Sequence, residues 1–178
     1  MSQGASAEGR STRRSSRVVV LAAFLAATPA LAAYDINGVA LGAHEKEIKK
    51  AFPSAFCKPL EWASRAADRR CDDAKIAVGG VDARITFYLR KDVIQAFDLR
   101  FDTKDLDAMV KFLKSHYGAP LAEAKEVSQK DPKSGKQVYK ARWEAGNDRA
   151  VLVSQLEQKR SQLTVSRGDF EEEIYRVR

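Results

Sequence analysis

The sequence predicts an α+β fold in which helices pack on one face of an antiparallel sheet. Apolar and polar residues alternate over residues 81–89 and again over 93–101, which predicts two half-buried antiparallel strands. A helical apolar pattern follows the second strand. Because the order helix then strands occurs twice, we expect two helix-then-antiparallel-strand units, with half-repeats 36–102 and 103–168 as a candidate duplication.

Apolar residues spaced three and four apart predict two main helices. The first is expected over residues 44–52 and ends before Pro53, and no good N-cap residue stands at its start. The second begins after Asp102 or Thr103 and ends at Gly118. Its buried stripe is formed by Leu106, Met109, Val110, Leu113 and Tyr117.

The remaining pattern predicts short strands and a weak last helix. Lys91-Asp92 makes a tight turn between two strands, which therefore form a hairpin. A helix over 169–176 is suggested by the capping-box spacing of Asp169 and Glu172. The strands are expected at residues 75–78, 81–89, 93–101, 122–129, 139–144, 150–157 and 163–165.

Residues 1–32 have the pattern of a secretory signal peptide. Four arginines precede an apolar run that is broken at Pro29 and is shorter than the roughly 20 residues of a membrane span. Small residues predict cleavage after Ala32, with Ala33 as the alternative. Residues 33–178 then form a single mature domain, periplasmic or secreted, with no transmembrane segment.

The export route and the charge of the mature chain follow from the same segment. General export is preferred, and the pair Arg13-Arg14 keeps twin-arginine export as an alternative. Cleavage removes four arginines and Glu8, so the net charge falls from +7 to +4. The sequence pI of about 9.5 therefore owes part of its value to the signal peptide. We expect no nucleic-acid partner.

Cys57 and Cys71 are the two cysteines of the chain, and in an oxidising compartment they predict a disulfide. A metal site that combines them with His44 and His116 lacks any typical ligand spacing, so no metal is expected. The loop closed by the disulfide presents a candidate binding surface formed by Trp62, Arg65, Arg69 and Arg70. In the alternative interpretation, the tryptophan fills the core and the arginines are solvated.

Catalytic motifs are missing from the sequence. It contains no nucleophile elbow, phosphate-binding loop or metalloprotease helix, and each histidine stands alone on its predicted helix. We therefore expect a protein that is not an enzyme and needs no cofactor.

The segment Val39-Ala40-Leu41-Gly42, followed by residues 47–52, resembles the Leu-Gly-x-x-x-x-Glu-Val-x-x-x-Phe opening of small exported helix-then-sheet proteins. Examples are the SmpA/OmlA-type assembly lipoproteins and the beta-lactamase inhibitor protein. The resemblance implies binding to other proteins, although this chain lacks the lipid-bearing cysteine.

The expected function is therefore that of a non-enzymatic periplasmic module that binds another envelope protein. An alternative function is binding of a small ligand, or of an anionic glycan or lipid surface, through the basic loop that contains Arg65, Arg69 and Arg70. A broad open sheet face would favour a protein partner, and a deep polar pocket would favour a ligand.

Overall fold

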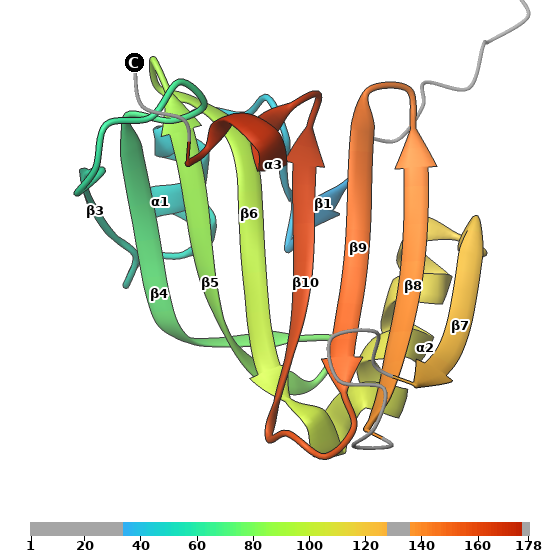
Figure 1. Cartoon of the computed structure of the whole chain (residues 1–178). Coiled ribbons are helices and arrows are strands. Elements are labelled where there is room, and N and C mark those ends of the chain that lie inside the picture. Colours follow the sequence, from blue (N-terminus) through green and yellow to red (C-terminus); the bar gives the residue numbers. More distant parts are fainter. Residues whose placement is uncertain (1–33, 128–135, 176–178) are drawn as a thin grey trace, which may run out of the picture.

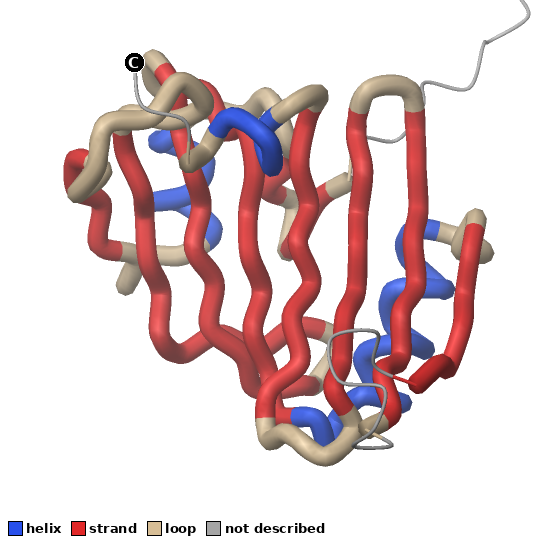
Figure 2. The backbone as a smooth tube through the Cα atoms, viewed as in Figure 1, coloured by secondary structure: helices blue, strands red, loops and turns tan. Residues whose placement is uncertain are grey.

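The computed structural model describes residues 34–127 and 136–175, which are dominated by one eight-stranded antiparallel sheet (Figures 1 and 2). The strand order is β3-β4-β5-β6-β10-β9-β8-β7. The strands are β3 (Phe56–Pro59), β4 (Arg69–Val78), β5 (Val81–Arg90), β6 (Val93–Asp102), β7 (Ala122–Val127), β8 (Gln137–Ala145), β9 (Asp148–Gln155) and β10 (Arg160–Arg167).

The remaining elements are short. Two strands, β1 (Asp35–Ile36) and β2 (Val39–Ala40), pair with each other in a separate small sheet. The helices are α1 (Glu45–Ala51), the 3-10 turn η1 (Thr103–Asp105), α2 (Leu106–Tyr117) and α3 (Phe170–Glu173). No helix in the described residues is both long and apolar enough to cross a bilayer.

The predicted α+β fold built from two helix-then-strand units is wrong. The described residues are mostly β, with about 19% helix, and the half-repeats 36–102 and 103–168 do not form separate units. The reason lies in the pairing of β6 with β10, which runs from Arg160 opposite Asp102 to Ser166 opposite Ala96. Backbone hydrogen bonds along this pair join the two halves into one sheet.

The inner face of the sheet is apolar and is covered by α1 and α2, which lie behind the sheet in Figure 1. Strand register aligns the core side chains in rows: Phe87 faces Phe97, which faces Val165, which faces Ala150. Ile48 of α1 and Met109 of α2 are fully buried against this face. Burial of such side chains stabilises the fold by about 1.5–3 kcal/mol each.

The outer face of the sheet is mostly polar and, among the described residues, carries only a small helix. In Figure 1, α3 crosses the sheet near one end, in front of β6 and β10. Phe170 and Ile174 pack there against Ala96, with Trp62 and Tyr88 beside them. The other end of the outer face, formed by β4, β5, β6, β10 and β9, has no helix in front of it.

Several predicted elements are confirmed with shifted ends. The first helix and the helix that ends at Gly118 are present, and Asp102 accepts a hydrogen bond from the backbone N–H of Lys104 at the start of η1. The strand expected at 75–78 is instead ten residues long and begins at Arg69. Residues 1–32, the cleavage positions Ala32 and Ala33, and the turn after β7 lie outside the described residues.

Candidate functional site

The uncovered part of the outer face carries a ladder of hydroxyl and carboxylate groups. Strand register places Asp72, Thr86, Asp98 and Thr164 side by side on β4, β5, β6 and β10. The Thr86 hydroxyl donates to Asp72 Oδ1 at 2.7 Å, and the Thr164 hydroxyl donates to Asp98 Oδ1 at 2.8 Å. These bonds fix the acidic side chains of the face in place.

Asp98 is the carboxyl of this ladder on β6. Its burial raises the pKa above the usual value, and the hydrogen bond from Thr164 and the positive charge of Arg100 oppose that rise. The nearby Tyr88 has a pKa raised to about 12, first by burial and then by the charge of Asp98. The ladder is therefore a structural network in which burial disfavours the charged form of Asp98.

The next row along the same face is basic. Arg84 of β5 lies directly opposite Arg100 of β6, and Gln162 of β10 lies on the other side of Arg100. Like charges that are directly opposite in an antiparallel pair destabilise a sheet. Neither arginine forms an ion pair with a described residue. The fold therefore keeps two exposed guanidinium groups in an unfavourable arrangement.

This basic row lies in a groove made of two adjoining hollows that share Arg100 and Arg160. The larger, about 710 Å³, is also lined by Lys75, Arg84 and Lys159. Its acidic residues are Asp82 and Asp102, and the Asp102 carboxylate accepts a bond from the backbone of Lys104. The smaller hollow, about 500 Å³, continues across β10 and β9 along Gln162, Thr164, Val151 and Val153.

The groove has the chemistry of an anion-binding surface. Planar guanidinium groups match the geometry of carboxylate and phosphate oxygens, with two parallel hydrogen bonds per group. None of the five basic side chains that line the larger hollow is ion-paired within the described part of the chain. They are therefore free to contact a ligand without first breaking an internal ion pair.

Trp62, the aromatic residue of the predicted binding surface, is half-buried at the end of the outer face near α3. Its indole N–H donates to the backbone carbonyl of Ile174 at 3.1 Å, and its ring stacks on Tyr175 with centroids 6.3 Å apart. Tyr175 itself is 80% exposed. The tryptophan thus anchors the segment after α3 and also borders an exposed aromatic side chain.

The three predicted arginines do not converge on one surface. Arg65 Nη1 lies 4.0 Å from Glu173, whereas Arg69 Nη2 lies 2.9 Å from Glu45 on the helix side of the sheet. Arg70 points to the outer face, where its Nε lies 3.0 Å from Asp72 Oδ2 without the alignment of a hydrogen bond. Each arginine is therefore near a different carboxylate, and Arg69 lies on the opposite side of the sheet from the other two.

A third hollow, of about 530 Å³, lies beside α3 and is lined by Arg65, Arg90, Arg167 and Glu173 among others. Arg167 donates two hydrogen bonds to the Asp148 carboxylate, at 2.7 and 2.9 Å, which raise the pKa of the guanidinium. Two of the three arginines here thus have carboxylate partners. This hollow has less uncompensated charge than the groove.

The predicted disulfide is confirmed. Cys57 on β3 and Cys71 on β4 are directly opposite in the register, with Cα atoms 3.9 Å apart, and they are bonded. The Glu45 carboxylate lies near both sulfur atoms. Because both sulfur atoms belong to the disulfide, neither is a thiolate that could ligate a metal ion.

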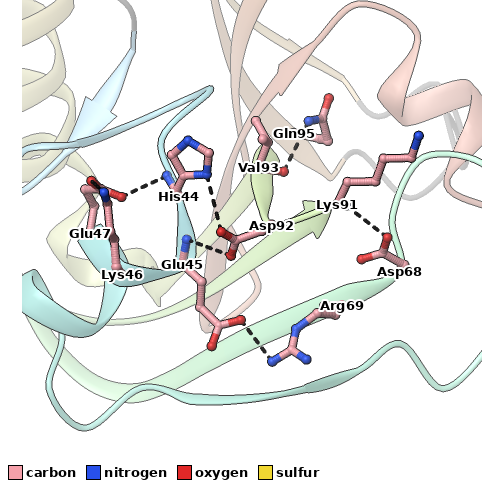
Figure 3. A network of polar contacts seen from close by, with 10 residues as sticks. All are labelled: His44, Glu45, Lys46, Glu47, Asp68, Arg69, Lys91, Asp92, Val93 and Gln95. Atoms are coloured by element: carbon pink, nitrogen blue, oxygen red, sulfur yellow. Dashed lines mark hydrogen bonds and ion pairs between the residues drawn. The ribbon is translucent and has the colours of Figure 1, made fainter.

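His44 belongs to a polar network that holds α1 against the turn between β5 and β6 (Figure 3). Its Nδ1 lies 3.4 Å from Asp92 Oδ2, and the Asp92 carboxylate also accepts the backbone N–H of Glu45 at 3.3 Å. Asp92 thereby caps the helix from a distant turn, in addition to the local contact in which Glu47 accepts the backbone N–H of His44 at 3.0 Å. The turn residues Lys91 and Asp92 both have positive φ, and Asp68 accepts the Lys91 backbone N–H.

His116 is positioned separately, with Nε2 3.0 Å from Asp35 Oδ2. It lies on α2, while His44 precedes α1 and pairs with a different carboxylate. The two histidines thus have structural partners of their own. Among the described residues, neither is hydrogen-bonded to a serine, threonine or cysteine that it could activate.

The groove residues Arg84, Arg100 and Arg160 were absent from the predicted binding surface. The sequence pattern places Arg84 and Arg100 on outward positions of their strands. It does not show that they face each other, because that depends on strand register. Arg160 comes from a strand that is distant in sequence, so a local pattern carries no signal for the group.

In comparisons with known proteins, no protein family, curated protein or solved structure matches the chain.

Proposed function

We propose that this chain is a non-enzymatic binding module that recognises another exported protein through the outer face of its sheet. The observation that carries the proposal is the unequal covering of the two faces. Helices α1 and α2 cover the inner face, whereas none of the described helices covers β4, β5, β6, β10 and β9 beyond α3 (Figure 1). A broad, regular and polar surface of this kind suits contact with another protein.

The side-chain chemistry supports binding rather than catalysis. The perturbed carboxyl of the face, Asp98, is held by Thr164, and the histidines are paired elsewhere with Asp92 and Asp35. A catalytic site needs a nucleophile or base with a positioned partner beside a place for substrate. The groove instead offers exposed guanidinium groups, which provide recognition.

The alternative of an anionic ligand held by the disulfide loop has less support from the geometry. Arg65, Arg69 and Arg70 diverge and lie beside carboxylates, so the loop presents little uncompensated positive charge. Basic side chains without an ion-pair partner among the described residues lie instead in the groove on the outer face. The Cys57–Cys71 disulfide is compatible with an oxidising compartment, and so it supports the export that we propose.

Site-specific photocrosslinking in the source cells tests the proposed face. A photoreactive side chain at Val153, in the groove, should yield a discrete adduct with another exported protein. The same group at Lys111, exposed on α2 on the other side of the sheet, serves as the matched control and should yield none. Adducts formed equally from both positions, or only from the control position, would contradict the proposal.

A further inference from the structure

We propose that the groove around Arg84, Arg100 and Arg160 binds an extended acidic segment of the partner protein. This inference rests on the proposed function and specifies the chemistry of the contact. Acidic side chains of the segment would pair with the guanidinium groups, with carboxylate oxygens accepting their N–H bonds.

The arrangement of the three arginines is the first argument. Arg84 and Arg100 are direct neighbours across β5 and β6, and Arg160 lies diagonally from Arg100 on β10. Asp98 and Asp102 lie close by, with Asp102 directly opposite Arg160, but neither forms an ion pair with a groove arginine in the described residues. Each accepts a hydrogen bond from another group, Asp98 from Thr164 and Asp102 from the Lys104 backbone. A ligand that brings its own carboxylates would relieve the repulsion among the arginines, whereas a cationic or neutral ligand would leave it in place.

The length of the groove is the second argument. Its two hollows are lined from β4 to β9, which are five neighbouring strands in the order β4-β5-β6-β10-β9. With neighbouring strands about 4.8 Å apart, the groove extends about 19 Å across the sheet. An extended peptide that rises about 3.3 Å per residue would place about six residues in it. A single phosphate group would occupy only a small part of this length.

The composition of the groove is the third argument, and it separates a peptide from a membrane surface. The large apolar residues that are most exposed in the described chain do not line either hollow; they are Phe56, Leu121, Val127 and Tyr175. Asp82, Asp102 and Glu171 lie along the groove and would repel a uniformly anionic bilayer. A flexible segment, unlike a bilayer, can place its acidic side chains beside the arginines and away from these three carboxylates.

Binding of an acetylated hexaglutamate peptide to the mature protein at low salt tests the inference, with hexaglutamine as the neutral peptide. The variant R84Q/R100Q/R160Q removes the three guanidinium charges of the groove and leaves Lys75 and Lys159 in place. Its control, K50Q/K111Q/K125Q, removes the same net charge from exposed positions on α1, α2 and β7. We expect hexaglutamate to bind the wild type and the control alike, and the groove variant about tenfold more weakly or worse. Hexaglutamine should not bind.

Folding of the groove variant is checked by its melting temperature, which should not fall, because the substitutions remove the repulsion between Arg84 and Arg100. Equal weakening in both triple variants, or no binding of hexaglutamate, would overturn the inference. Preferential binding of inorganic phosphate or of phosphatidylglycerol vesicles would overturn it as well. The crosslink from Val153 separates the acidic-segment inference from the proposed function. If the adduct forms at full yield in the groove variant, the acidic-segment inference is refuted and the proposed function is not.

Discussion

Reduction of the Cys57–Cys71 disulfide should lower the stability of the protein by about 3 kcal/mol. The bond closes a loop with a sequence separation of 14 residues, and the chain-entropy relation gives about 3 kcal/mol for a loop of this size. For a domain of this size, each kcal/mol corresponds to roughly 3–4 °C in melting temperature, so we expect a decrease of about 10 °C. Thermal unfolding followed by circular dichroism, with and without reductant, measures it.

The structure also predicts where the effect should be greatest. Strand β3 lies at the edge of the sheet with β4 as its one neighbour, and the disulfide joins the middle of that pair. After reduction, the backbone amides of β3 should therefore exchange with solvent faster than those of the central strands β6 and β10. The variant C57A/C71A is the control, since its melting temperature should not respond to reductant. A wild-type decrease of less than about 3 °C would refute the entropic reasoning.

Three further predictions concern single positions. In chemical denaturation, Gly79→Ala should destabilise the protein by about 1 kcal/mol or more beyond Gly80→Ala. Both glycines have positive φ, but only at Gly79 would a Cβ meet the Phe112 ring, at 2.5 Å. Equal losses would contradict this contact. Asp98→Asn should raise the melting temperature at pH 7 but not below about pH 4. The pKa of Asp98 is raised in the folded protein, so the protein loses stability as the pH rises through that pKa, and asparagine avoids this loss. A gain that persists at low pH would show another cause. Trp62→Phe should cost about 1 kcal/mol of unfolding free energy through the lost bond to Ile174, and an unchanged value would mean that this bond is neutral.

Local patterns predicted the elements whose side chains alternate or repeat without interruption. The helix that ends at Gly118 and the strand around Ile85 and Phe87 follow from such patterns and are present. The pattern failed on β4, where a register shift between Asp73 and Ile76 breaks the alternation. Asp73 is buried there and accepts hydrogen bonds from the Ser54 hydroxyl and the Lys75 backbone. From the sequence alone, an aspartate at this position indicates a loop, because it does not show that the carboxylate is buried with hydrogen-bond partners. The predicted strand therefore began too late, at residue 75.

An irregularity in strand pairing also explains why the alternation over residues 93–101 predicted the wrong face for the first residues of β6. Strict alternation places Val93 and Gln95 on the face of Phe97, but the fully buried residue at this end of the inner face is Ile94. Between Ala96 and Ile94 the strand contains one extra residue relative to Tyr88 and Leu89 on β5. This β-bulge changes the face of every side chain on one side of it. The capping box expected at Asp169 likewise lacks its side-chain bond.

The bulge also connects the fold to the candidate site. The two-residue turn at Lys91-Asp92 sets Arg90 opposite Val93, and without the extra residue the same register would place Arg84 opposite Leu99. Because Leu99 is a fully buried core residue, that register would turn either the core or Arg84 to the wrong face. The bulge keeps Leu99 in the core and brings Arg84 opposite Arg100 on the outer face. The basic pair of the groove is thus a consequence of register, which is why the separate strand sequences show two outward arginines but not the site that they form together.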